Sequence, residues 1–200
     1  MKYAGVIVDT RNVNFKSIIE RHFEFLPGKF DCVVFHDQNS VNFDCIKHQI
    51  PRSINNLRDY NDLMTSEWFW DKLIYDKVLI FQNDSGLLRK GIEEFYKWDY
   101  VGAPWKFQDI GGNGGLSWRS VKVMKKISKQ KPYSLIYGFE DVYFCNEMKE
   151  KGLNIAPREV CKKFSCETIF ELGTLGYHAI RNYMSEEQCN DILNQYKNKA

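Results

Sequence analysis

Apolar runs and helix-patterned segments alternate along the chain from its beginning. Residues 3–9 (YAGVIVD) form a short apolar run that ends in polar residues, and residues 30–37 (FDCVVFHD) form a second one. The segment between them repeats apolar residues at helical spacing, at Phe15, Ile18, Ile19, Phe23 and Leu26. Pro27 and Gly28 then end this helix. The pattern predicts a β-α-β unit whose two strands are parallel and joined by a right-handed crossover.

The alternation of strands and helices continues through the middle of the chain. After a polar and irregular stretch at residues 38–60, an aromatic-rich helix is predicted from Asp62 to Leu73. The apolar run KVLIF at residues 77–81 is a third strand. A short helix around residues 92–97 leads into a loop-rich region that contains DYVGAPW and DIGGNGGLSWRS.

Three further helices are predicted in the second half, at residues 120–128, 140–151 and 186–196, with LNIAP as a strand after the second. The last helix begins with Ser185, Glu186, Glu187 and Gln188, which have the form of a capping box. The chain contains no internal repeat, low-complexity segment or linker. We therefore expect a single α/β domain.

Composition and charge exclude several classes of protein. The 200 residues are 44% hydrophobic and 15% aromatic, which is enough for a packed core and excludes disordered, fibrous and disulfide-stapled chains. Lys and Arg number 28 against 26 Asp and Glu, and the two signs are interspersed, so bulk electrostatic binding of nucleic acid is not expected. Six cysteines without a CxxC pair predict reduced core thiols.

The opening MKYAGVIVDTRN has no small-residue cleavage site, and no run of 18 apolar residues follows. We therefore expect a cytoplasmic chain that is neither secreted nor membrane-spanning.

A polar cluster, Gln82, Asn83, Asp84 and Ser85, comes directly after the predicted strand at residues 77–81. In open α/β sheets, ligands bind beyond the carboxyl ends of the strands. Asp84 could ligate Mg²⁺ or Mn²⁺ that bridges a diphosphate, since these ions favour one or two carboxylates plus phosphate oxygens. The same residue types also favour turns that bind no ligand, so both interpretations stay open.

A dense glycine loop surrounds Asn113, with glycines at Gly111, Gly112, Gly114 and Gly115. It matches neither of the two familiar nucleotide-binding loops, GxGxxG and GxxxxGK. Its glycines allow a ligand to approach the backbone closely, and the Asn113 amide could bind sugar hydroxyls. The alternative is a hairpin without a ligand.

Two adjacent acids, Glu140 and Asp141, begin the predicted helix at residues 140–151. Acids at this position stabilise a helix through its dipole. Alternatively, one carboxylate accepts the proton of an attacking hydroxyl while the other orients a substrate. The helix N-terminus lowers the pKa of a carboxylate, which predicts a base that is ionised at neutral pH.

A late histidine, His178, follows the loop GTLGYH. It could close a metal site with Asp84. The alternative is a loop histidine that is held only by hydrogen bonds.

The ordered series FQNDSGLL, DYVGAPW, GGNGGLSWRS, GFEDVYFC and GYH resembles the glycosyltransferase-like family known as domain of unknown function 5672, which occurs in giant viruses, fungi and bacteria. This resemblance covers nearly the whole chain. The glycine loop followed by Glu-Asp is more remotely similar to fringe-type, core-1 and β1,4-galactosyltransferases. Those are GT-A enzymes, whose Rossmann-like, mostly parallel sheet binds a nucleotide-sugar and usually Mn²⁺.

The resemblance implies roles for individual residues. Asp84 matches the last acid of the metal-binding DxD motif, and His178 matches the histidine that completes the metal site. Asp141 or Glu140 matches the catalytic base, with Asp141 favoured and Glu140 left to hold an acceptor hydroxyl. Gln82 stands where the DxD motif has its first Asp, a departure that should weaken metal binding.

The resemblance also implies the binding sites for the donor and for the acceptor. Thr10 and Arg11 match a nucleotide-contacting loop. The donor site then contains Thr10, Arg11, Gln82, Asn83, Asp84 and Ser85. The sugar and acceptor pocket contains Trp105, Asn113, Gly114 and Gly115. Trp105 and Trp118 would suit stacking on sugar faces.

A GT-A-like domain over residues 1–200 would comprise a nucleotide-binding half at about 1–105, an acceptor half at about 106–184 and a C-terminal helix at 185–200. The implied activity is inverting, divalent-metal-assisted transfer from a UDP-sugar to a glycan or glycoprotein acceptor, in the host cytoplasm or the virion if the chain is viral. A non-catalytic module that binds carbohydrate or nucleotide-sugar is the main alternative. A nucleotidyltransferase ranks last, because VIVDTRNVN lacks its glycine-rich basic signature.

Overall fold

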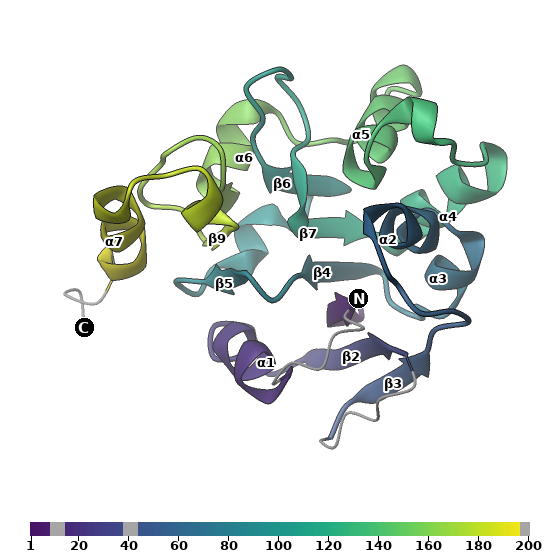
Figure 1. The fold of residues 1–200 in the computed structure, drawn as a ribbon, viewed down its shortest axis with the longest axis horizontal. Helices are drawn as coiled ribbons and strands as arrows, with labels where there is room; N and C mark the ends of the chain where they lie inside the picture. Colours follow the sequence, from purple (N-terminus) through teal and green to yellow (C-terminus); the bar gives the residue numbers. More distant parts are fainter. Residues whose placement is uncertain (9–14, 38–43, 197–200) are drawn as a thin grey trace.

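The computed structural model describes residues 1–8, 15–37 and 44–196. Its main sheet has six strands, which are β1 (Tyr3–Val8), β2 (Phe30–His36), β3 (Ile46–Gln49), β4 (Lys77–Phe81), β6 (Tyr100–Ala103) and β7 (Asn113–Ser120). They lie in the order β3-β2-β1-β4-β7-β6 (Figure 1). The ladders among β1 to β4 are parallel, and β7 is antiparallel to both of its neighbours. The predicted α/β fold with a mostly parallel sheet is confirmed.

The first two strands form the predicted β-α-β unit with helix α1 (Phe15–Phe23). Tyr3 pairs with Phe30 and Val8 with Phe35 in a continuous parallel register. Both strands are largely buried, because the sheet is covered on its two faces.

The remaining helices are α2 (Leu57–Met64), α3 (Glu67–Asp71), α4 (Val121–Gln130), α5 (Glu140–Glu150), α6 (Arg158–Phe164) and α7 (Glu186–Asn194). Short 3₁₀ helices occur at η1 (Ile92–Phe95), η2 (Leu135–Tyr137) and η3 (Ile180–Asn182). The predicted capping box at Ser185 and Gln188 is present at the start of α7.

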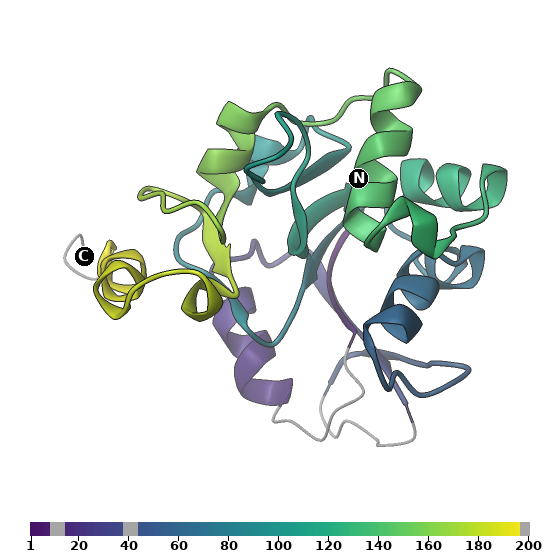
Figure 2. The ribbon, with the colours of Figure 1, turned by 45° about the horizontal axis from the view of Figure 1, so that its top comes forward.

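The sheet separates two apolar cores, and successive residues of a strand alternate between them. In β1, Ala4 and Val6 pack in the first core, and Tyr3 and Ile7 pack in the second. Helices α2 to α5 cover the first core, whereas α1, α6 and η1 cover the second (Figure 2). The protein is therefore a three-layered α/β/α structure.

A second, three-stranded sheet joins distant parts of the chain. Its strands are β5 (Ser85–Leu87), β8 (Ser165–Cys166) and β9 (Gly176–His178), in the order β5-β9-β8. The antiparallel pairing of β5 and β9 sets Ser85 opposite His178. This pairing brings the polar cluster after β4 beside the late histidine.

The structure differs from the sequence predictions in four segments. The stretch at residues 38–60 contains β3 and the start of α2, and the helix expected at 62–73 is divided into α2 and α3. A new N-cap causes this division, since the Ser66 side chain accepts a hydrogen bond from the Phe69 N–H. LNIAP forms isolated bridges at Ile155 and Pro157 and no named strand.

The region predicted to be loop-rich contains two strands of the main sheet, β7 inside it and β6 at its edge. Seven of the eight residues of β7 are buried, so the strand shows no alternation of polar and apolar residues. Close packing of the two strands requires glycine at position 102 of β6, because a Cβ there would lie 2.2 Å from the Asn113 carbonyl oxygen of β7.

All six cysteines are free, and four of them are buried as predicted, whereas Cys32 and Cys45 are half-buried. Within the described ranges, no helix is both long enough and apolar enough to cross a membrane.

Candidate functional site

One cavity of about 280 Å³ lies where the carboxyl end of β4, the start of β7 and the end of β9 meet. Its lining includes predicted site residues from distant parts of the chain, namely Gln82, Asp84, Asn113, Gly114, Gly115, Glu140, Asp141 and His178. The Gln82 N–H donates to the Gly115 carbonyl at 2.9 Å, which holds the polar cluster against the glycine loop. The fold thus collects in one cavity residues that the sequence predicts separately.

His178 contacts three polar side chains. Its Nε2 lies 3.3 Å from Asp84 Oδ1 and 3.0 Å from Gln82 Oε1. Its Nδ1 lies 3.1 Å from Oε1 of the buried Glu167. The backbone fixes this arrangement, because the N–H of Ala179 donates to the Asp84 carbonyl and Ala179 itself has a left-handed φ of 48°.

The charge around His178 favours a cation. Burial lowers the pKa of His178, but its hydrogen bonds and charge interactions with Asp84 and Glu167 raise it more, to about 9. Glu167 does not stand out in the sequence, where its only signal is that an acid lies within the mostly apolar segment FSCETIF. Two carboxylates around one imidazole attract either a proton or a metal ion.

Asp84 Oδ1, His178 Nε2 and the Gln82 amide oxygen are the donors that could hold a metal ion here. A carboxylate on the far ring nitrogen, as Glu167 is on Nδ1, is typical of metal-binding histidines. The described part of the chain contains no cluster of three or more His, Cys, Asp or Glu side chains suited to a metal ion. A cation at this position would therefore need oxygens from a ligand.

Asp141 lies in the same cavity and is held by two backbone N–H groups. Its Oδ2 accepts from Gly114 N at 2.9 Å, and its Oδ1 accepts from Val142 N at 2.7 Å. Burial and the neighbouring Glu140 raise the pKa of Asp141 to about 7, against the opposing effects of these N–H groups and Arg119. The helix dipole predicted a lowered pKa, but in the structure burial outweighs it.

Glu140 forms an ion pair with Arg119, a fully buried residue of β7. The two guanidinium nitrogens Nη1 and Nη2 lie 2.6 and 2.7 Å from the two carboxylate oxygens. The guanidinium also stacks 5.0 Å from the centre of the Tyr100 ring. Both Glu140 oxygens are therefore engaged inside the protein, an arrangement that the sequence analysis does not anticipate.

Two further contacts fix the start of α5. The side chain of Asn61, on α2, accepts a hydrogen bond from the backbone N–H of Glu140 at 2.9 Å. Gly114 leaves room for the ion pair, since a Cβ there would lie 2.3 Å from Glu140 Oε1 and 2.5 Å from Arg119 Nη2. The glycine loop is thus shaped by the charged side chains that pack against it.

The other predicted residues lie at the margin of the cavity or away from it. Asn113 lines the cavity, and its Oδ1 accepts the N–H of Gly115 at 2.7 Å. Asn83 lines an adjoining cavity, and its carbonyl accepts from Arg21 at 2.9 Å. Ser85 is fully buried, and its hydroxyl is bound to His22 and to the Gln82 carbonyl.

The tryptophans predicted to stack on sugars are core side chains in the structure. Trp105 is 6% exposed and stacks on Phe107 with 5.2 Å between ring centres. Trp118, on β7, is fully buried in the second core. Thr10 and Arg11 lie outside the described residues.

The α/β fold of the protein is similar to that of a solved glycosyltransferase. The apo-form glycosyltransferase GlyE of Streptococcus pneumoniae TIGR4 has a similar fold, with a TM-score of 0.55 and 13% sequence identity. That similarity covers 100% of this chain and 64% of GlyE, so the chain spans less than two thirds of the longer protein. A197 from STIV has a TM-score of 0.46 at 14% identity, over 74% of this chain and 78% of its own.

The family model described as protein of unknown function (DUF5672) matches residues 40–178, which is more than half of the chain. The chain belongs to this family, as the motif series predicted. No curated protein matches the sequence. The more remote similarity to fringe-type and β1,4-galactosyltransferases stays a prediction.

Proposed function

We propose that this protein is a glycosyltransferase that moves a sugar from a nucleoside diphosphate sugar, with a UDP-sugar as the first candidate, to an acceptor hydroxyl. The observation that carries the proposal is the shared cavity, in which the Asp84–His178 pair and the carboxylate of Asp141 both lie. The Asp84–His178 pair could hold a metal ion against a diphosphate leaving group, and the Asp141 carboxylate could act as a general base. The similarity of the fold to GlyE supports this class of reaction.

At the donor end, Asp84 and His178 would hold Mn²⁺ or Mg²⁺ together with the diphosphate. When bound, such an ion supplies the positive charge that stabilises the departing phosphates. Gln82 offers only a neutral oxygen, so the affinity of the protein for the ion would be lower than with two carboxylates at this position. His178 in its protonated form would place a positive charge at the same position.

At the acceptor end, Asp141 would act as the base. The acceptor oxygen forms a bond to the anomeric carbon while the bond from that carbon to the diphosphate oxygen breaks, and its electron pair leaves with the diphosphate. The hydroxyl proton passes to the Asp141 carboxylate, whose pKa of about 7 suits proton transfer near neutral pH. A single displacement of this kind inverts the anomeric configuration.

Glu140 is the weaker candidate for the base. Both of its oxygens bind Arg119, so protonating or redirecting this carboxylate would leave a buried guanidinium without its partner. We assign Glu140 and Arg119 the role of holding the start of α5, and with it Asp141, against the glycine loop.

The donor half of the proposal is tested by thermal denaturation with UDP or GDP, each with and without Mn²⁺, since a ligand of the native state raises its apparent stability. We expect a shift that Mn²⁺ enlarges in the parent protein and does not enlarge in Asp84→Ala. Asp191→Ala, an exposed acid on α7, is the control and should behave as the parent. Equal effects of Mn²⁺ in all three proteins would contradict metal binding through Asp84.

A second candidate is a module that binds the nucleotide-sugar without chemistry. The replacement of an expected carboxylate by Gln82 favours it. Hydrolysis of the donor or its transfer separates the two, because a pure binding module does neither.

A further inference from the structure

Two more cavities adjoin the candidate site and extend away from it. One, of about 360 Å³, shares Asp84, Ala179 and Asn182 with the site cavity. The other, of about 430 Å³, shares Arg21, Tyr177 and Leu193 with the first. We call the two together the side groove. Its residues come from α1, β5, β9 and α7 and from the segments beside them.

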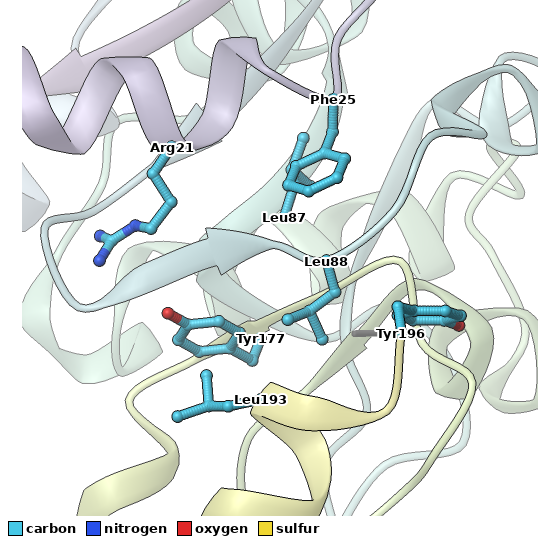
Figure 3. Close-up of a pocket in the computed structure, with 7 residues that line it drawn as sticks. All are labelled: Arg21, Phe25, Leu87, Leu88, Tyr177, Leu193 and Tyr196. Atoms are coloured by element: carbon cyan, nitrogen blue, oxygen red, sulfur yellow. The ribbon is translucent and has the colours of Figure 1, made fainter. Parts of the chain in front are cut away.

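The outer part of the side groove is apolar. Leu87, Leu88 and Leu193 line it together with Phe25 and two tyrosines. Figure 3 shows these side chains around a common space, with Arg21 and the hydroxyl of Tyr177 at one side and Tyr196 at the other. The leucines offer no hydrogen bonds, so a ligand group bound among them must itself be apolar.

The inner part of the side groove carries two arginines, Arg21 and Arg181, and one acid, Asp84. Arg21 donates from Nη2 to the Asn83 carbonyl, and its buried Nε has no hydrogen-bond partner in the described portion of the chain. Arg181 is exposed, and its side chain makes no ion pair with another described residue. Two guanidinium groups against one carboxylate favour an oxyanion, which guanidinium binds with paired N–H groups.

We propose that the side groove binds an amphiphilic acceptor, in which an apolar chain carries a phosphate-like oxyanion. The chain would lie among the leucines, the oxyanion between Arg21 and Arg181, and the sugar-accepting part in the cavity of Asp141. Charge complementarity and continuity with the site cavity through Asp84 favour this ligand. The role of this ligand as the acceptor rests on the proposed function, whereas its binding in the side groove does not.

Calorimetry with soluble probes tests the binding site without any donor. The probes are octyl phosphate, hexyl phosphate, inorganic phosphate and octyl glucoside, each below its micelle concentration. We expect octyl phosphate to bind at least fivefold more tightly than hexyl phosphate, up to about fifteenfold if both extra methylenes are fully buried. Inorganic phosphate and octyl glucoside should each bind far more weakly, because each lacks one half of the ligand.

Variants assign the two halves of the side groove. Arg181→Ala should weaken octyl phosphate binding about tenfold, as expected for a lost charged hydrogen bond. Leu193→Trp should fill the apolar part and abolish the preference for octyl over hexyl phosphate, with Leu193→Ser as the substitute if it does not fold. Arg158→Ala, an arginine of α6 that lines neither cavity, is the control and should bind as the parent.

Equal affinities for octyl and hexyl phosphate, or unchanged binding in Arg181→Ala and in the Leu193 variant, would overturn the proposal. Octyl glucoside binding as tightly as octyl phosphate would overturn the oxyanion. These measurements are independent of catalysis, so a protein that transfers no sugar can still confirm the side groove. A transferase that fails them still keeps its proposed activity with another class of acceptor.

Discussion

Arg119 and Glu140 form a two-pronged ion pair in the interior, with Nη1 2.6 Å from Oε2 and Nη2 2.7 Å from Oε1. Removing one partner leaves the other charge buried without compensation, so Arg119→Met should lower the free energy of unfolding by about 3–5 kcal/mol. The double variant with Glu140→Leu should recover part of this loss. Urea denaturation of both variants provides the measurement.

A surface ion pair supplies the control for that experiment. Lys125 and Asp71 pair on the surface, with the Lys125 side chain 39% exposed. Lys125→Met should cost far less than Arg119→Met, because solvent screens such pairs. A loss for Arg119→Met no greater than the loss for Lys125→Met would contradict the structural role assigned to the buried pair.

Gly115 faces the imidazole of His178 so closely that a Cβ there would lie 2.1 Å from Nε2. Gly115→Ala should therefore displace His178 from Asp84 and remove the extra thermal stabilisation that Mn²⁺ gives to bound UDP. Gly28→Ala is the matched control, since a Cβ on Gly28 has nothing within 4 Å. If Gly115→Ala keeps the full effect of Mn²⁺, the imidazole does not take part in metal binding.

Asp141 should make the stability of the protein depend on pH. Its pKa is about 7 in the folded protein, mainly because of burial, against an ordinary value of 3.8. Between about pH 4 and pH 7 the native state then holds a proton that the unfolded chain releases, so this residue's contribution to stability falls as pH rises through that window. Urea denaturation at pH 5 and pH 8 should show a smaller difference for Asp141→Asn than for the parent. Identical differences in the two proteins would mean that Asp141 titrates as an ordinary surface acid.

The sequence predicts the parts of the fold whose pattern is local. The strand at residues 77–81 is marked by its apolar run. The helix that begins at Glu140 is marked by the acids at its start and by Gly152 after its end. Strand β7 does not, because burial on both faces removes the alternation that marks a strand, and its glycines are typical of a loop. Gly114 and Gly115 are required by side chains that approach from distant elements, which local patterns cannot show.

The candidate site is predictable to the extent that its residues follow strands or begin helices. Asp84 and Asp141 are found in this way, and the cavity contains both. Arg119 and Glu167 are not, because each is defined by a partner in another element, Glu140 and His178 respectively. The same reason explains the raised pKa of Asp141, which depends on burial by the tertiary structure.

Sugar transfer by Asp141→Asn and Glu140→Gln, measured side by side with the parent, tests the central claim most directly. The account predicts that Asp141→Asn folds and binds the nucleotide as the parent does, while transfer falls by roughly 10²–10⁴-fold, the usual contribution of a general base. Glu140→Gln should lose stability through its contact with Arg119 and retain more of the transfer than Asp141→Asn. Full transfer activity in folded Asp141→Asn would contradict the account, and full activity in both variants would also remove this cavity as the catalytic centre.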